Sequence, residues 1–129
     1  MSSKLENSSL VTCDFASSID KSQKGDLIYC DPVYSVNEKS NGFIKYNDRV
    51  FNWNDQLRLK DCIDKAVKRG VNVVLSNIHH ECVLDLYKDY PYKIIERKSL
   101  IGKKRKTISE CLFVIGKNEG LRMDIFDSV

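Results

Sequence analysis

The chain has 129 residues, of which 42% are hydrophobic, and its formal net charge is +3. This length supports one hydrophobic core and excludes a second domain of ordinary size. The small net charge does not by itself indicate a nucleic-acid partner. The sequence contains no apolar run long enough to cross a bilayer and no basic-then-apolar leader, so we expect a cytoplasmic protein with no membrane association.

The cysteines indicate neither a zinc site nor a disulfide framework. They are widely spaced and form no C-x-x-C pair: Cys13, Cys30, Cys62, Cys82 and Cys111. Zinc sites need ligands at close, regular spacing, so the sequence predicts no metal site. We expect reduced thiols, with Cys30, Cys62 and Cys111 packed in the core as small hydrophobes.

The amino-terminal segment carries weak structural signals. Residues 1–9 are rich in Ser and polar side chains and are expected to form a disordered lead-in. A β-rich run predicts a short strand over residues 10–13, and residues 14–19 indicate a turn or short helix. We expect one domain over residues 10–118, followed by a flexible tail over 119–129.

The next elements predict a parallel β-α-β unit. Residues 27–30 are continuously apolar between two turn-forming pairs, which is typical of a parallel strand buried on both faces. Residues 35–51 form a long loop of a kind that often carries function. A helix is expected from Asn52 to Gly70 and then a second buried strand over 71–75. Ligands bind such units beyond the carboxyl ends of the strands.

The remainder of the chain predicts a helix and an antiparallel hairpin. The helix covers residues 79–90 and stops before Pro91. Two strand-like runs follow at 92–97 and 111–115 without an intervening helix. The expected fold class is therefore α/β, with parallel strands, crossover helices and a carboxyl-terminal antiparallel hairpin.

Positive charge is concentrated in the connection of this hairpin. The range from Lys93 to Lys106 contains seven basic residues and the single acid Glu96, which gives a local charge of +6. Such a segment is suited to contacts with nucleic-acid phosphates, which are independent of sequence and weakened by salt. The alternative is a solvated loop that only aids solubility, which is the more common role of charge runs.

Asp31-Pro32-Val33-Tyr34 follows the first buried strand and places an acid and an aromatic ring at the strand end. A carboxylate and the carbonyl of Pro32 are both acceptors, so they could hold the two N–H groups of an exocyclic amine while Tyr34 stacks on the base. This arrangement would suit an adenine that has left the base stack. The alternative is that Asp-Pro simply ends the strand.

A family resemblance favours the first interpretation. Residues 25–34 resemble the strand and D-P-P-Y motif of Dam-like adenine-N6 DNA methyltransferases. Further segments similar to that family follow in order: Asn41-Gly42-Phe43 with Tyr46, Phe51-Asn52, Val74-Leu75-Ser76-Asn77, Leu86-Tyr87, Arg97-Lys98-Ser99-Leu100, Arg105-Lys106-Thr107 and Glu110-Cys111-Leu112. The resemblance covers residues 14–116 and implies a partial Rossmann-like methyltransferase sheet.

The resemblance also implies an activity and its chemistry. Members of that family transfer a methyl group from S-adenosylmethionine to the amino nitrogen of a flipped adenine in DNA. By this resemblance, Asp31 and the Pro32 carbonyl would accept hydrogen bonds from the amine, and Tyr34 would stack on the base. Positioning and electrostatics would contribute more than strong base catalysis.

The resemblance assigns further residues to the cofactor and the substrate. Asp14 and Phe15 would lie beside the adenine of the cofactor, and Asp31 would contact the cofactor as well. The expected substrate-binding residues are Phe43, Tyr46, Ser76, Asn77, Lys103, Lys104, Arg105 and Lys106. Of these, Phe43 and Tyr46 would lie on a loop that closes over the target, and the four basic residues would face DNA phosphates.

Two features depart from the family pattern. Val33 stands where the family has a second proline, and the sequence contains neither the F-x-G-x-G cofactor motif nor the target-recognition region that precede D-P-P-Y in the family. We therefore expect a fragment or split subunit that forms a homodimer or pairs with a complementing amino-terminal half. The alternative is a catalytically inactive remnant that retains DNA binding or another interaction.

Overall fold

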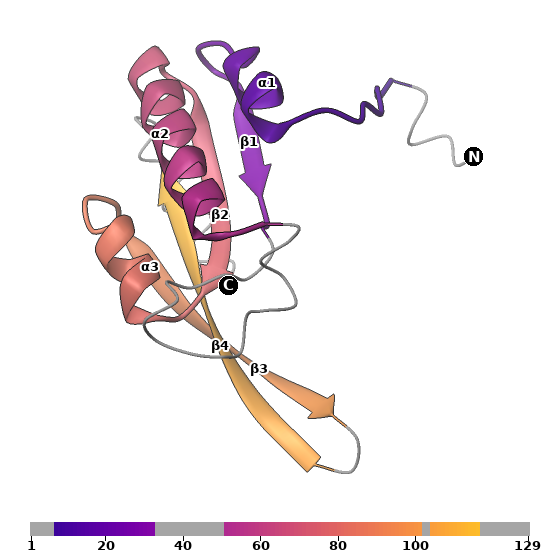
Figure 1. The fold of residues 1–129 in the computed structure, drawn as a ribbon, viewed down its shortest axis with the longest axis vertical. Helices are drawn as coiled ribbons and strands as arrows, with labels where there is room; N and C mark the ends of the chain where they lie inside the picture. Colours follow the sequence, from indigo (N-terminus) through magenta and orange to yellow (C-terminus); the bar gives the residue numbers. More distant parts are fainter. Residues whose placement is uncertain (1–6, 33–50, 102–103, 117–129) are drawn as a thin grey trace.

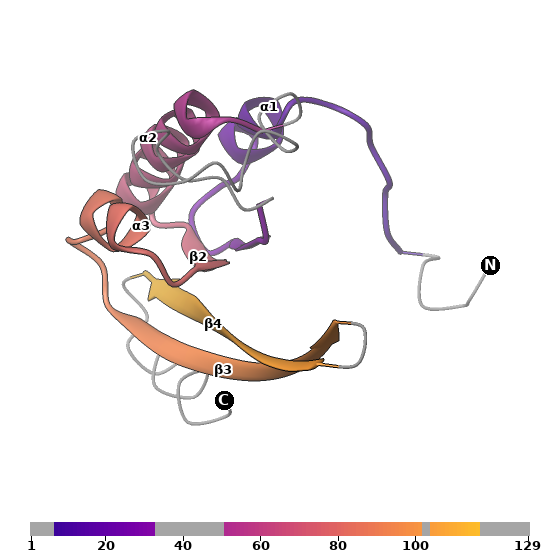
Figure 2. The same ribbon diagram turned by 60° about the horizontal axis from the view of Figure 1, so that its bottom comes forward.

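The computed structural model describes residues 7–32, 51–101 and 104–116. Its elements in chain order are α1 (Phe15–Asp20), β1 (Leu27–Cys30), α2 (Trp53–Arg69), β2 (Asn72–Ile78), α3 (Glu81–Leu86), β3 (Tyr92–Ile101) and β4 (Lys104–Ile115). The three helices cover one face of a twisted sheet (Figures 1 and 2). None of the helices described is long and apolar enough to cross a membrane.

The sheet is mixed, as the sequence predicts. Its strand order is β1-β2-β4-β3. Strand β1 pairs in parallel with β2, from Leu27 opposite Asn72 to Cys30 opposite Leu75. Strand β4 runs antiparallel to both β2 and β3. The predicted β-α-β unit and the predicted hairpin are therefore joined in one sheet through β4.

Helix α2 has the ends that its sequence predicts. The side chain of Asn52 accepts a hydrogen bond from the Asp55 N–H at 3.0 Å, and the Asp55 carboxylate accepts one from the Asn52 N–H at 3.0 Å. This capping box satisfies donors that the first helical turn leaves free. Gly70 ends the helix with φ 93°, in the left-handed region that favours glycine. Local sequence signals thus fix the position of α2 between the two parallel strands.

The hydrophobic core lies between the helices and the sheet. Its fully buried members include residues of the two central strands, of α2 and α3, and of the turn after α3: Ile63, Ala66, Val73, Leu75, Val83, Tyr87, Cys111 and Phe113. A smaller buried cluster, formed by Val74, Leu112 and Val114, lies on the opposite face of the sheet. The two central strands, β2 and β4, are therefore buried on both faces.

The expectation that residues 27–30 are buried on both faces is wrong. Leu27 and Tyr29 are 55% and 65% exposed, whereas Ile28 and Cys30 face the helices and are partly buried. The reason is the position of β1 at the end of the described sheet, where it has one strand neighbour and helices on one side only.

Two other predicted elements differ from the structure. Residues 10–13 form no strand: Leu10 and Val11 are 84% and 69% exposed, and no neighbouring strand pairs with them in the described part of the chain. Helix α3 is shorter than residues 79–90. It begins after His80, whose side chain accepts a hydrogen bond from the Cys82 N–H, and it gives way to a turn at Tyr87.

The hairpin is longer than the sequence indicates. The pairing of β3 with β4 extends to Ile101 opposite Lys104, whereas the pairing of β2 with β4 stops at Ile78 opposite Glu110. Residues 104–109 of β4 therefore continue beyond β2 and pair only with residues 96–101 of β3. This two-stranded segment, the basic ribbon, projects from the body of the protein in Figure 1. The basic segment lies largely in paired strands and not, as predicted, in a loop.

A polar cluster joins α2 to the turn after α3. Lys60 forms an ion pair with Asp64 at 2.6 Å, and the Tyr90 hydroxyl donates a hydrogen bond to the other Asp64 oxygen. Nearby, the Tyr87 ring packs 5.1 Å from the Phe113 ring, measured between centroids. The Tyr87 hydroxyl is buried and has no hydrogen-bond partner within the described residues.

These two tyrosines are expected to respond in opposite ways to loss of the hydroxyl. Tyr87→Phe removes a buried, unpaired polar group and should leave the free energy of unfolding unchanged or raise it by about 1 kcal/mol. Tyr90→Phe removes a hydrogen bond to a carboxylate and should lower it by about 1 to 2 kcal/mol. Urea unfolding of the two variants measures both values, and a loss of stability in Tyr87→Phe would mean that its hydroxyl has a partner.

Candidate active site at the end of β1

Asp31 and Pro32 follow the last residue of β1, at the edge where ligands bind to parallel strands. Because Cys30 lies opposite Leu75, the register places Asp31 beside Ser76 of β2. The structure therefore brings the residue after β1 close to Ser76 of the neighbouring strand. Asp31 is exposed, while Ser76 is 6% exposed.

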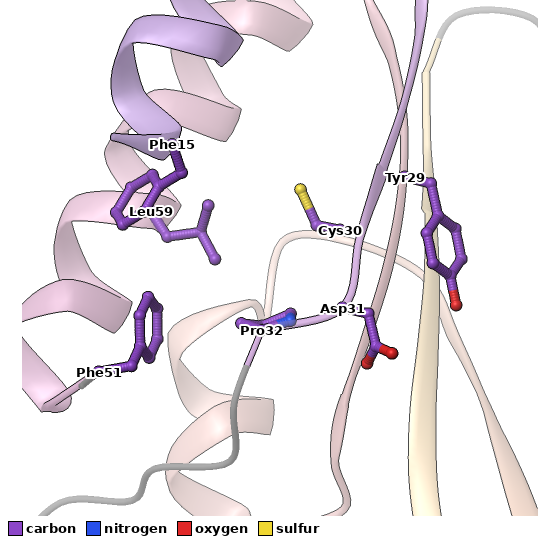
Figure 3. A pocket seen from close by; sticks show the side chains of 7 residues that line it. All are labelled: Phe15, Tyr29, Cys30, Asp31, Pro32, Phe51 and Leu59. Atoms are coloured by element: carbon purple, nitrogen blue, oxygen red, sulfur yellow. The ribbon is translucent and has the colours of Figure 1, made fainter. Parts of the chain in front are cut away.

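A pocket of about 360 Å³ surrounds this strand end. It is lined by Phe15, Tyr29, Cys30, Asp31, Pro32, Phe51 and Leu59. Figure 3 shows Phe15, Phe51 and Leu59 on the helix side of β1, with Tyr29 and Asp31 directed away from them. The helix side of the pocket is therefore an apolar wall, whereas the Asp31 carboxylate points to the other side of the strand end.

The two phenylalanine residues of the apolar wall lie at the beginnings of two helices. Phe15 is the first residue of α1, and Phe51 directly precedes the cap of α2. Their ring centroids are 5.9 Å apart and the ring planes are tilted by 57°. This separation is typical of a favourable aromatic pair. An apolar wall of this kind is suited to the flat ring of a base.

Asp14 caps α1 and forms an ion pair with α2. Its carboxylate accepts a hydrogen bond from the Ala16 N–H at 3.2 Å and another from Arg58 at 2.7 Å. The pKa of Asp14 lies below its usual value, mainly because Arg58 donates this hydrogen bond to the carboxylate. Arg58 also contacts Asp55 at 3.3 Å, and its Cζ lies 4.1 Å from the centroid of the Phe15 ring.

Cys30 contributes a neutral thiol to the pocket. Burial raises its pKa to about 11, so the thiolate is scarce at neutral pH. Since the thiolate is the reactive form of cysteine, Cys30 acts as an apolar wall and not as a nucleophile. Its place in the apolar part of the pocket agrees with the core role that its sequence context indicates.

Asn77, predicted to contact substrate, is fully buried within β2. Its amide donates a hydrogen bond to the Gln56 side chain at 3.2 Å and accepts one from the Ile78 N–H at 2.8 Å. The contact with Gln56 connects β2 to α2. Ser76 and Asn77 also lie inside the strand, because β2 continues to Ile78 and does not stop at Leu75 as predicted.

Several predicted site residues lie outside the described part of the chain: Tyr34, Phe43, Tyr46 and Lys103. Lys104, Arg105 and Lys106 lie in β4, and Arg105 is exposed. The ribbon that carries them extends beyond the carboxyl end of β2, which is the same end of the sheet as Asp31. The structure therefore places the basic segment and the pocket at one end of the molecule.

Part of the pocket lining is not predicted by the sequence. The sequence pattern places Phe51 at the end of a loop and predicts that Tyr29 is buried in the sheet. In the structure, both residues line the pocket together with Leu59 of α2. The position of Phe51 next to a helix cap is the one available signal, since a residue before an N-cap often packs against its own helix. Within the described ranges, no group of three His, Cys, Asp or Glu side chains is placed to hold a metal ion.

Comparison with known proteins gives the family of the chain. Residues 1–102 match the family model described as D12 class N6 adenine-specific DNA methyltransferase. The chain belongs to this family. It is also 32% identical over 122 residues, 93% of its length, to the type II methyltransferase M1.LlaDCHI from Lactococcus lactis subsp. cremoris. The matched region spans 43% of that relative.

The Asp14–Arg58 pair should make stability depend on pH in the acid range. Because the pKa of Asp14 is lowered by folding, its charged form stabilises the protein above the ordinary value of 3.8, and this contribution disappears as pH falls through the folded-state pKa. Asp14→Asn keeps a good helix cap but removes the charge. Its urea midpoint should lie below that of the wild type at pH 7 and converge with it near pH 2. A difference that persists unchanged in acid would contradict the ion pair.

Proposed function

We propose that this chain carries the base-binding and methyl-transfer groups of a DNA adenine-N6 methyltransferase. The observation that carries this proposal is the pocket at the end of β1, where Asp31 and Pro32 adjoin an apolar wall containing Phe15 and Phe51. Family membership supplies the reaction class, and the pocket supplies acceptors beside a surface suited to a base. We also infer that the four described strands belong to a larger Rossmann-like sheet.

In this proposal, Asp31 and the Pro32 carbonyl hold the amino group of a flipped adenine. S-adenosylmethionine, when bound, supplies the electrophilic methyl group. The two acceptors would orient the nitrogen lone pair toward the methyl carbon. They would also stabilise the positive charge that develops on nitrogen as the carbon–nitrogen bond forms and the carbon–sulfur bond breaks, with S-adenosylhomocysteine as the leaving group. The excess proton then leaves to water or to the Asp31 carboxylate. Tyr34 stacks on the base, and Phe43 and Tyr46 close over it.

The cofactor contacts are assigned to the helix side of the pocket. Phe15 offers an aromatic surface for the adenine of S-adenosylmethionine, and Phe51 lies 5.9 Å from it between centroids. The chemistry of this wall fits an adenine ring, because aromatic stacking on a base is sequence-tolerant and stabilising. Oδ2 of Asp14 already accepts hydrogen bonds from Ala16 and Arg58. We therefore assign the other carboxylate oxygen, Oδ1, to a cofactor contact.

The basic ribbon is assigned to DNA phosphates. It extends beyond β2 at the pocket end of the sheet, so DNA whose flipped base enters the pocket would pass near it. Arg105 is exposed there, and the connection at 102–103 contributes Lys103. Contacts of this kind position the duplex without reading its sequence.

The exposed edge of β1 supports assembly with a complementing polypeptide. Leu27 and Tyr29 place exposed apolar surface beside backbone groups that have no strand partner in the described ranges. Such edges favour strand addition. Since the chain matches 43% of its Lactococcus relative, we propose that the missing partner resembles the rest of that protein. A homodimer through the same edge is the alternative outcome of an assembly experiment.

Asp31→Asn is expected to abolish most methyl transfer while leaving the fold intact. The assay combines this chain with the portion of the Lactococcus methyltransferase outside the aligned region and measures labelled methyl incorporation into adenine-containing DNA. Loss of a positioned acceptor should reduce kcat by about 100-fold or more. Asp61→Asn is the matched control, because Asp61 is an exposed acid of α2 that pairs with Lys65 away from the pocket.

Two outcomes of that assay would contradict the proposal. Full activity of Asp31→Asn would remove Asp31 from the chemistry. No activity of the wild-type assembly, together with DNA binding that Asp31→Asn does not change, would favour the catalytically inactive DNA-binding remnant.

The basic ribbon should account for much of the salt dependence of DNA binding. Replacing Lys104, Arg105 and Lys106 by Gln should weaken binding similarly for all sequences and reduce the slope of log K against log salt by about 0.9 for each phosphate that is no longer neutralised. The control replaces the exposed Lys21, Lys65 and Lys68, which lie away from the ribbon, and changes net charge equally. Equal slopes for the two triple variants would show that only net charge matters.

A further inference from the structure

Arg58 connects the first turns of α1 and α2, next to which Phe15 and Phe51 line the pocket. It lies on α2, six residues after the Asn52 cap, and does not itself line the pocket. Its guanidinium contacts Asp14, the cap of α1, at 2.7 Å and Asp55, the capping-box residue of α2, at 3.3 Å. One side chain therefore holds the beginnings of α1 and α2 together.

The same guanidinium lies over an aromatic ring of the pocket. Its Cζ is 4.1 Å from the centroid of Phe15, within the range of a cation–π contact. A guanidinium over one face of Phe15 restricts how this pocket-lining ring can turn. Asp55, which Arg58 also contacts, accepts a hydrogen bond from the backbone N–H of Asn52, next to Phe51. Arg58 thus contacts the Phe15 ring directly and is linked to Phe51 through Asp55 and Asn52.

This arrangement requires the shape of arginine as well as its charge. A planar guanidinium can donate to two carboxylates in its plane while its face stacks on a ring, whereas the ammonium group of lysine is a point charge. Ion pairs at the surface generally contribute little to stability, and the Arg58 side chain is 44% exposed. A role in stability alone therefore leaves the stacked geometry unexplained.

We propose that Arg58 is a positioning residue that keeps Phe15 and Phe51 in the relative orientation needed to bind the adenine ring of a nucleoside in this pocket. The role of the pocket as a nucleoside site rests on the function proposed above. The effect of Arg58 on the position of the two rings does not rest on that function. Ring positioning and nucleoside binding can therefore be tested separately.

The test compares Arg58→Gln with Lys65→Gln in the full chain. Lys65 is the matched control because it is an exposed cation on the same helix, paired with Asp61 at 2.9 Å. NMR gives two readouts, the nuclear Overhauser effects between the Phe15 and Phe51 rings and the dissociation constant of adenosine as probe. Thermal unfolding midpoints of both variants serve as the stability readout.

We expect Arg58→Gln to abolish the Overhauser effects between the two rings and to weaken adenosine binding by about tenfold, with a midpoint close to that of Lys65→Gln. Arg58→Lys should retain the midpoint but not the Overhauser effects, because it keeps the charge without the planar face. Lys65→Gln should leave both NMR readouts unchanged.

Two results would overturn the proposal: Overhauser effects between the rings that persist in Arg58→Gln, or an equal drop in adenosine affinity in Arg58→Gln and Lys65→Gln. If the wild-type chain does not bind adenosine but the Overhauser effects still disappear in Arg58→Gln, Arg58 positions the rings and the nucleoside assignment of the pocket is wrong.

Discussion

The parallel pairing of β1 with β2 is the constraint on which the candidate site depends. Parallel neighbours need a crossover, and α2 supplies it, with its start fixed by the Asn52–Asp55 capping box and its end by Gly70. This connection returns the chain so that the start of α2 lies beside the carboxyl end of β1. Phe51 and Asp31, which are 20 positions apart in the sequence, therefore line one pocket.

The end position of β1 gives the site two unlike sides. The helix side is apolar, because Phe15, Phe51 and Leu59 pack around Cys30 (Figure 3). The other side carries the exposed Tyr29 and the Asp31 carboxylate. A site for methyl transfer to an amine needs both an apolar surface for flat rings and acceptors for N–H groups, and residues of both kinds line the pocket at the end of β1. The same exposed edge is where we propose that a complementing polypeptide adds to the sheet.

Local signals predicted much of the fold, whereas burial and pocket lining depended on neighbours that the sequence does not specify. The cap residue Asn52 and the terminating Gly70 predicted α2 within one residue, since both act through their own backbone. The apolar run at 27–30 predicted a strand correctly but not its exposure, which depends on what adjoins it in the sheet. Asp31 could be selected as a site residue from its motif, while Phe51 required the crossover geometry. The interaction of Arg58 with Asp14 joins residues 44 positions apart and has no signal in the sequence.

The central claim is that the pocket at the end of β1 brings the cofactor and the target adenine together, which requires that the cofactor binds within this chain. Ultraviolet cross-linking of S-adenosylmethionine labelled in its adenine ring tests it most directly, using this chain assembled with the complementing portion of the Lactococcus relative. Peptide mapping should locate the label on peptides that contain Phe15 or Phe51, and unlabelled S-adenosylmethionine should compete it away. Label found only on the complementing portion, or on β3 and β4, would contradict the account.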